Sequence, residues 1–183
     1  MSAYLAALAV TIRVHDVYGL SPEQHREAAA VATATLGEAG VQAAILDCGR
    51  RRAAAACAAP LVPGELVLRV LSHPPEGLHV LGDAIVHHPD ESTVATVYAA
   101  AVTARAQRLG LPVGLLVGRV AAHEIGHLLL GTRTHARDGL MRASWDIQRR
   151  RPEDWRFSRE DAAAIRLRLA RRAEATALLT ARR

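Results

Sequence analysis

Residues 112–131 most constrain what this chain can fold into, because they combine an apolar helix with three closely spaced polar side chains. The stretch opens on Pro112, is rich in Val, Leu and Ala, and ends at Gly131, which is typical of a buried helix. It contains the run His123-Glu-Ile-Gly-His127. Residues four apart on a helix lie on one face, so the two imidazoles can converge on one metal ion. Polar groups inside an apolar helix need a partner, and a metal ion satisfies both histidines.

Glu124 adds a candidate general base to this histidine pair. It lies about 100° around the helix from His123, too far to complete the pair but well placed to reach a water molecule on the metal. The pattern predicts zinc-dependent hydrolysis, with His123 and His127 as metal ligands and Glu124 as the catalytic residue. For these five residues alone, two histidines that only pack in a core or lie at the surface remain an alternative.

The residues beyond the helix offer a third ligand. After a turn at Gly131 the chain presents His135. Three protein ligands leave one coordination position for water, which distinguishes a catalytic zinc site from a structural one. We therefore expect one Zn²⁺ ion, with His135 completing the histidine pair.

The stretch from His123 to Met141, H-E-I-G-H-L-L-L-G-T-R-T-H-A-R-D-G-L-M, resembles the active site of the zincin metallopeptidases and, within them, the metzincin clan. It is most similar to small bacterial metzincin-like proteins with the pattern H-E-[IL]-G-H-L-L-L-G-x-x-x-H-x-x-x-G-[IL]-M-R-x-x-W, which here continues to Trp145. The resemblance extends more loosely from the first strand to the final helix. It implies a zinc metalloendopeptidase with a peptide or protein substrate, and a Met141 that packs beneath the ligands.

The spacing of the third ligand departs from the usual metzincin pattern. There, glycine and histidine follow the second ligand by three and six residues, whereas Gly131 and His135 follow His127 by four and eight. Some zincins use a carboxylate after the glycine turn, and others a glutamate from a later helix, which makes Asp138 and Glu160 the alternatives. Imidazole is the commonest completion of a histidine pair, so His135 is preferred.

Two other functions are compatible with the motif. One is a zinc-binding protein of zincin fold without proteolysis, and the other is a zinc hydrolase of a non-peptide substrate. The intact Glu124 argues against the first, because zinc retention does not need it. The helix motif does not exclude the second.

The first half of the chain predicts a βαβ unit followed by further strands. Ser21, Pro22 and Gln24 form a capping-box signature for a helix that ends near residues 37–40. Residues 93–98 are ambiguous between a short strand and the start of the helix that ends at residues 109–110. Alternating or β-branched runs predict strands at residues 8–16, 41–47, 65–72 and 81–88.

The predicted fold is α/β (α+β), a metzincin-like zincin with a mixed twisted sheet lobe, a central active-site helix and a small helical C-terminal lobe. By resemblance, residues 81–86 are the antiparallel edge strand that borders the cleft. Residues 1–183 form a single catalytic domain, with lobes at 1–131 and 132–183. Ser158 caps a last helix whose Ile165, Leu167 and Leu169 are expected to pack against the catalytic lobe.

Composition restricts the classes of molecule that this chain is expected to bind. The chain has 183 residues, 50% of them hydrophobic, which suits one domain with ample core. Its net charge is +5 and all 23 basic residues are Arg, but no aromatic interleaving or nucleic-acid motif accompanies them. No run of 18 apolar residues suggests a membrane span. We expect a monomer that binds neither nucleic acid nor membrane.

The remaining polar residues leave questions open. Cys48 and Cys57 are either joined by a disulfide, which favours secretion, or unpaired. The N-terminus lacks a signal peptide, so the chain either stays inside the cell or is a trimmed mature form. His87-His88 are expected to be exposed loop histidines. No spacing assigns Tyr18 or Tyr98 as a transition-state donor.

Overall fold

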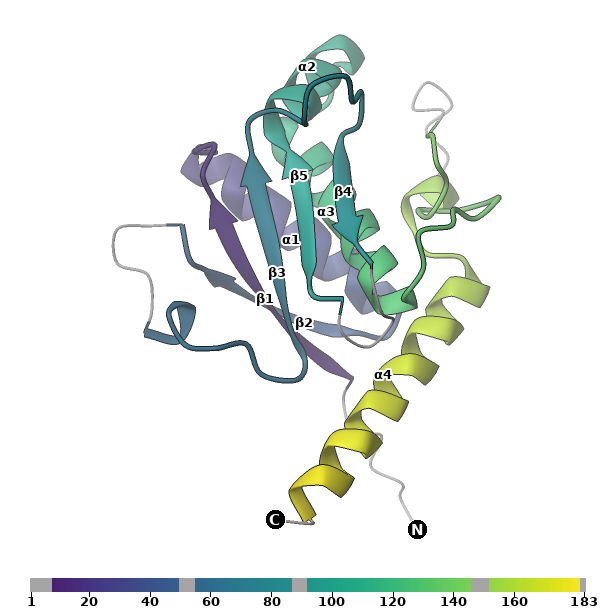
Figure 1. Ribbon diagram of the computed structural model, residues 1–183. Coiled ribbons are helices and arrows are strands. Elements are labelled where there is room, and N and C mark those ends of the chain that lie inside the picture. Colours follow the sequence, from purple (N-terminus) through teal and green to yellow (C-terminus); the bar gives the residue numbers. More distant parts are fainter. Residues whose placement is uncertain (1–7, 50–54, 87–91, 146–151, 182–183) are drawn as a thin grey trace.

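The computed structural model describes residues 8–49, 55–86, 92–145 and 152–181, and Figure 1 shows their arrangement. The chain begins with a strand, a helix and a second strand, continues with three further strands, and is mainly helical after residue 98. The elements follow in the order β1 (Ala9–Asp16), α1 (Pro22–Glu38), β2 (Gln42–Asp47), the short 3₁₀ helix Ala55–Cys57, β3 (Glu65–Leu71), β4 (Gly82–Ile85), β5 (Val94–Tyr98), α2 (Ala99–Leu109), α3 (Val113–Leu130), the 3₁₀ turn Pro152–Trp155 and α4 (Arg159–Ala181).

The described strands form one mixed sheet in the order β2-β1-β3-β5-β4. All neighbours are parallel except β4, which runs antiparallel to β5 with Gly82 opposite Val97 and Ile85 opposite Val94. The predicted antiparallel edge strand is therefore confirmed, although it ends at Ile85 rather than reaching residue 88. The ambiguous residues 93–98 form β5, and the helix α2 begins directly after it.

Helices α1 and α3 lie side by side on one face of the sheet (Figure 1). Alternate strand residues such as Ile12, Leu68 and Val97 point into the core between sheet and helices. By length and hydropathy α3 could also cross a membrane, but 78% of it is buried within the protein. Its apolar character on all sides is explained by this central position, as expected of a core helix.

Two glycines on α3 set its distance from α1. A β-carbon at Gly118 would lie 2.6 Å from the carbonyl oxygen of Ala28, and one at Gly114 would lie 2.7 Å from that of Gln24. Any larger residue would push the helices apart. These glycines hold α3 close to α1 and thereby position the histidines further along α3.

The predicted caps of α1 and α4 are present. Ser21 and Gln24 form the reciprocal capping box of α1, and the Ser158 hydroxyl accepts a hydrogen bond from the backbone N–H of Asp161 at the start of α4. The packing expected for α4 is correct at two of its three positions: Ile165 and Leu169 are buried, the four-residue spacing that places them on one face.

The expectation for Leu167 is wrong, because its side chain is 53% exposed. Two residues along a helix correspond to a rotation of about 200°, so Leu167 points away from the face that carries Ile165.

Cys48 and Cys57 are joined by a disulfide, with their Cα atoms 5.6 Å apart. The sequence left open whether these cysteines are bonded or unpaired, and the structure shows that they form a disulfide. The disulfide links the end of β2 to the 3₁₀ helix Ala55–Cys57. Buried Arg13 reinforces the following segment by donating to the carbonyl of Ala59 at 2.6 Å and by pairing with Glu65.

Candidate metal centre

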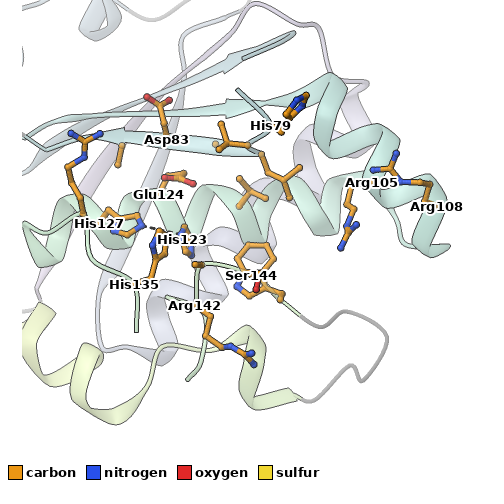
Figure 2. A pocket seen from close by; sticks show the side chains of 18 residues that line it. His79, Asp83, Arg105, Arg108, His123, Glu124, His127, His135, Arg142 and Ser144 are labelled. Atoms are coloured by element: carbon orange, nitrogen blue, oxygen red, sulfur yellow. Dashed lines mark hydrogen bonds between the residues drawn. The ribbon is translucent and has the colours of Figure 1, made fainter. Parts of the chain in front are cut away.

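Three histidines converge at the C-terminal end of α3 (Figure 2). His123 and His127 project from α3 and His135 from the loop that follows, and their candidate ligand atoms all lie within 4.8 Å of one another. Asp138 and Glu160, the alternative third ligands, are exposed and lie outside this cluster. The structure thus brings together the three predicted residues, while their ligation of a metal stays a prediction.

The two helical histidines are oriented through their Nδ1 atoms. His123 Nδ1 lies 2.7 Å from the carbonyl oxygen of Leu140, and His127 Nδ1 lies 2.9 Å from that of Thr132. A carbonyl can only accept, so each Nδ1 carries the proton and donates it. In a neutral ring the proton on Nδ1 leaves the lone pair on Nε2, which is the tautomer that binds a metal through Nε2.

These lone pairs face each other. The Nε2 atoms of His123 and His127 are 3.1 Å apart. Since both Nδ1 atoms are already protonated, neither Nε2 of the neutral rings has a hydrogen to donate, and the pair repel each other unless a cation lies nearby. Tetrahedral zinc with bonds of about 2.0–2.1 Å places its ligand nitrogens roughly 3.3 Å apart. The residues present therefore fit a zinc ion.

The loop after α3 accommodates the long spacing to His135. Gly131 ends the helix in the left-handed conformation at φ 62°. The two following threonines then form a local turn, in which the Thr132 hydroxyl accepts the backbone N–H of Thr134 at 3.1 Å. The Thr132 carbonyl at the start of this turn also orients His127. The extra residues thus build a turn that supports a histidine and still returns His135 to the cluster.

Met141 packs against α3 at Gly126, and its place beneath bound ligands stays a prediction from the resemblance. It is 1% exposed, and its sulfur lies only 2.6 Å from where a β-carbon on Gly126 would be. The Cε1 atom of Phe157 lies 2.7 Å from the same β-carbon position on Gly126. Gly126, between His123 and His127, is thus the point at which α3 contacts Met141 and Phe157.

We expect Gly126→Ala to destabilise the protein by about 1–3 kcal/mol, because the new methyl group overpacks a space already filled by Met141 and Phe157. Gly37→Ala is the matched control: it also lies in a helix, but nothing approaches its β-carbon position within 4 Å. There the substitution should stabilise by about 0.5–1 kcal/mol through helix propensity. Urea unfolding of both variants measures the difference, and equal effects would contradict the packing account.

Glu124 lies against the edge strand. Its side chain is buried, and a β-carbon on Gly82 would lie 2.8 Å from its Oε1 and 2.7 Å from the carbonyl of Thr96. Burial raises the pKa of Glu124 to about 8, and the nearby negative charge of Asp83 adds to the shift. Burial also lowers the pKa of His123 to about 4 and lowers the pKa of His127. His123 and His127 are therefore neutral, which is the form that binds a metal.

The Glu124 shift predicts a pH dependence of the metal-free protein. Between the ordinary pKa of 4.5 and the folded pKa of about 8, the folded state holds a proton that the unfolded state has released. This contribution to stability is complete below pH 4.5 and is lost as the pH rises towards 8. The histidines are the same in the wild type and in a Glu124 variant, so their own titration cancels when the two proteins are compared.

We expect wild-type protein in chelator to lose about 1–2 kcal/mol of unfolding free energy between pH 6.5 and 8, relative to Glu124→Gln. Urea unfolding at the two pH values measures this difference. Glutamine has a similar shape and does not titrate, so it removes the contribution. Parallel pH profiles for the two proteins would show that Glu124 does not cause the pH-dependent loss of unfolding free energy.

Asp83 is a polar neighbour of Glu124 that the sequence did not single out. It accepts a hydrogen bond from the Tyr98 hydroxyl at 3.1 Å. Burial and Asp83 together raise the pKa of Tyr98 to about 12, so this phenol stays protonated. Tyr18 lies in the loop after β1 and does not line the cleft. Only the pairing of β4 with β5 brings Asp83 to Glu124, and sequence spacing alone carries no signal for that register.

The histidines and Glu124 line a cleft of about 600 Å³. Its upper wall in Figure 2 is residues 79–84, which include most of β4, and its floor is α3. The loop that carries His135 and Trp145 closes the opposite side, and α2 contributes Arg105 and Arg108 at one end. His87-His88 lie outside the described residues.

Comparison with known proteins supports the fold. No family model matches the chain, and no curated protein matches it. Among solved structures it is similar to the crystal structure of archaemetzincin from Methanopyrus kandleri, with a TM-score of 0.58 over 90% of this chain and 98% of that chain, at 18% sequence identity. The predicted fold class, a mixed α/β architecture of metzincin-like fold, is therefore confirmed.

Proposed function

We propose, from the archaemetzincin fold and the site within it, that this chain is a zinc-dependent metalloendopeptidase in which Glu124 is the general base. One observation carries the proposal: three imidazoles, two of them oriented by backbone carbonyls, converge beside a buried glutamate. A protein that only stored or was stabilised by zinc would not need a carboxylate held at that point.

Each residue has a distinct task in the reaction. His123, His127 and His135 would hold one zinc ion, and because a bound imidazole carries no charge, the ion would keep its full charge. When bound, zinc polarises a carbonyl group and lowers the pKa of a water molecule towards about 7. Glu124 accepts a proton from the attacking water and passes it to the leaving amine.

The edge strand supports a peptide as the substrate. Among the described strands β4 pairs only with β5, so its other side offers backbone groups with no strand partner there to an extended chain. Gly82 lies against Glu124, so a strand added along β4 passes beside the base and the histidines. We propose that a monomer cleaves peptide or protein substrates without nucleic acid or a membrane. The Cys48–Cys57 disulfide supports an oxidising compartment.

Incubation of zinc-loaded protein with a diverse peptide library, with and without a chelator, tests the proposal. We expect cleavage at internal peptide bonds that is abolished by the chelator and restored by added zinc. Zinc binding without cleavage of any peptide would contradict it, and would favour a non-proteolytic zincin or a hydrolase of another substrate.

A further inference from the structure

Two arginines lie at one end of the catalytic cleft. Arg105 and Arg108 are three residues apart on α2 and therefore share a face of that helix. Figure 2 shows both at the end of the cleft away from His127 and His135. Within the part of the chain that the structure describes, neither is paired with a carboxylate.

The other charged groups around the cleft do not neutralise this pair. Arg133 and Arg142 are also cationic, and Arg142 already faces Asp154 at 3.4 Å. Asp83 and Glu124 are the carboxylates that line the cleft among the described residues, and Asp83 accepts the Tyr98 hydroxyl. An anionic group at the α2 end would therefore meet positive charge that has no partner there.

The sheet shows where the α2 end of the cleft lies relative to the scissile bond of a bound substrate. The backbone N–H of Tyr98, directly before α2, donates to the carbonyl of Leu81 at 2.9 Å, so α2 begins beside the start of β4. Glu124 lies at Gly82. A substrate strand antiparallel to β4 would run from the Ile85 end of β4 to Gly82 and on past Leu81. Its residues on the C-terminal side of the cleaved bond would then approach α2, in the better hydrogen-bonded of the two pairing directions.

We infer that Arg105 and Arg108 recognise a carboxylate on the C-terminal side of the scissile bond, and so select acidic substrates. The carboxylate belongs either to an acidic side chain or to the C-terminus of the substrate itself. Planar guanidinium groups suit it, because they bind carboxylates in a bidentate geometry. This inference rests on the proposed peptidase function and adds the substrate class that the site prefers.

Matched peptides test the inference. A peptide cleaved in the library is made with Glu or Gln at each of the three positions after the cleaved bond, as a free acid and as a C-terminal amide. We expect kcat/KM to be about tenfold higher for Glu at one position, or for the free acid, because two partly exposed ion pairs each add a few-fold. A Glu preference among the amides identifies the side chain, and a preference for the free acid identifies the terminus.

Variants assign the preference to the arginines. In Arg105→Gln/Arg108→Gln the preference should fall to about one, and in Arg105→Glu/Arg108→Glu a Lys-containing peptide should be preferred. Arg171→Gln, an exposed arginine on α4 outside the cleft, should keep the wild-type preference. An equal rate for all carboxylate and amide forms, or a preference that survives Arg105→Gln/Arg108→Gln, would overturn the inference.

A binding experiment separates this inference from the proposed function. Zinc-loaded Glu124→Gln protein is titrated calorimetrically with blocked peptides of one sequence that carry Glu or Gln, and with their unblocked C-terminal forms. About tenfold tighter binding of a carboxylate form, lost in the Arg105→Gln/Arg108→Gln background, supports the inference even if the wild type cleaves no peptide. Cleavage without any preference overturns the inference and leaves the peptidase proposal intact.

Discussion

Glu124→Gln should lower kcat/KM for peptide cleavage by about a thousandfold while leaving the zinc content at one ion per chain. The amide fills the same space beside Gly82, so we expect the structure to stay the same. It cannot accept a proton from water, and that loss removes general base catalysis. Glu124 is not part of the histidine cluster, so the metal should remain. Steady-state kinetics and metal analysis on the same preparation give both results.

Glu160→Gln is the matched control for this variant. It makes the same carboxylate-to-amide change at an exposed position of α4 outside the cluster and the cleft. We expect wild-type rate and wild-type zinc content. Cleavage by Glu124→Gln at the wild-type rate would show that another group acts as the base.

His135→Ala should weaken zinc binding by more than about a hundredfold and abolish cleavage at limiting zinc. Loss of groups that merely orient ligands costs about 10–100-fold in affinity, and a direct ligand is expected to cost more. His135 is exposed and lies in the loop after α3, so its truncation should leave the fold intact. Competition with a chromophoric chelator measures the zinc affinity, and thermal melting in excess chelator checks the fold.

Asp138→Asn provides the control for the third ligand. Asp138 lies three residues beyond His135 in the same loop, yet it is exposed and outside the cluster. Its substitution should leave the zinc affinity unchanged. A loss of zinc in Asp138→Asn together with retention in His135→Ala would transfer the role of third ligand to the carboxylate.

The helix and its ends were predictable because their signals are local. Pro112 and Gly131 bound α3 as expected, and Gly131 adopts the left-handed conformation that ends helices. The capping box at Ser21 likewise depends on side chains only three residues apart. The alternation of buried residues along β3 reports a sheet with one covered face. At the helix ends the interaction partners are neighbours in the sequence, and in β3 the alternation itself is visible in consecutive residues.

Features that depend on distant pairing were not predictable from the chain alone. The approach of Gly82 and Asp83 to Glu124 requires the antiparallel register of β4 with β5 and the packing of α3 beneath them. The position of Arg105 and Arg108 at the cleft depends on where α2 begins relative to the start of β4. None of these residues has a diagnostic spacing to His123.

The long spacing to His135 combines a local sequence signal with a contact that depends on the folded structure. The motif identified a histidine after a glycine turn, but it follows His127 by eight positions instead of six. In the structure, the turn at Thr132 and Thr134 takes up residues of this segment and also supplies the carbonyl that orients His127. The longer segment is therefore compatible with convergence of the three rings.

A crystal structure of the zinc-loaded protein, with the ion located by anomalous scattering, tests the central claim most directly. We expect one zinc ion about 2.0–2.1 Å from the Nε2 atoms of His123 and His127 and from a ring nitrogen of His135, with Glu124 beside the ion but not bound to it. A carboxylate from Asp138 or Glu160 in place of His135, or Glu124 bound directly to the zinc, would contradict the proposed catalytic site.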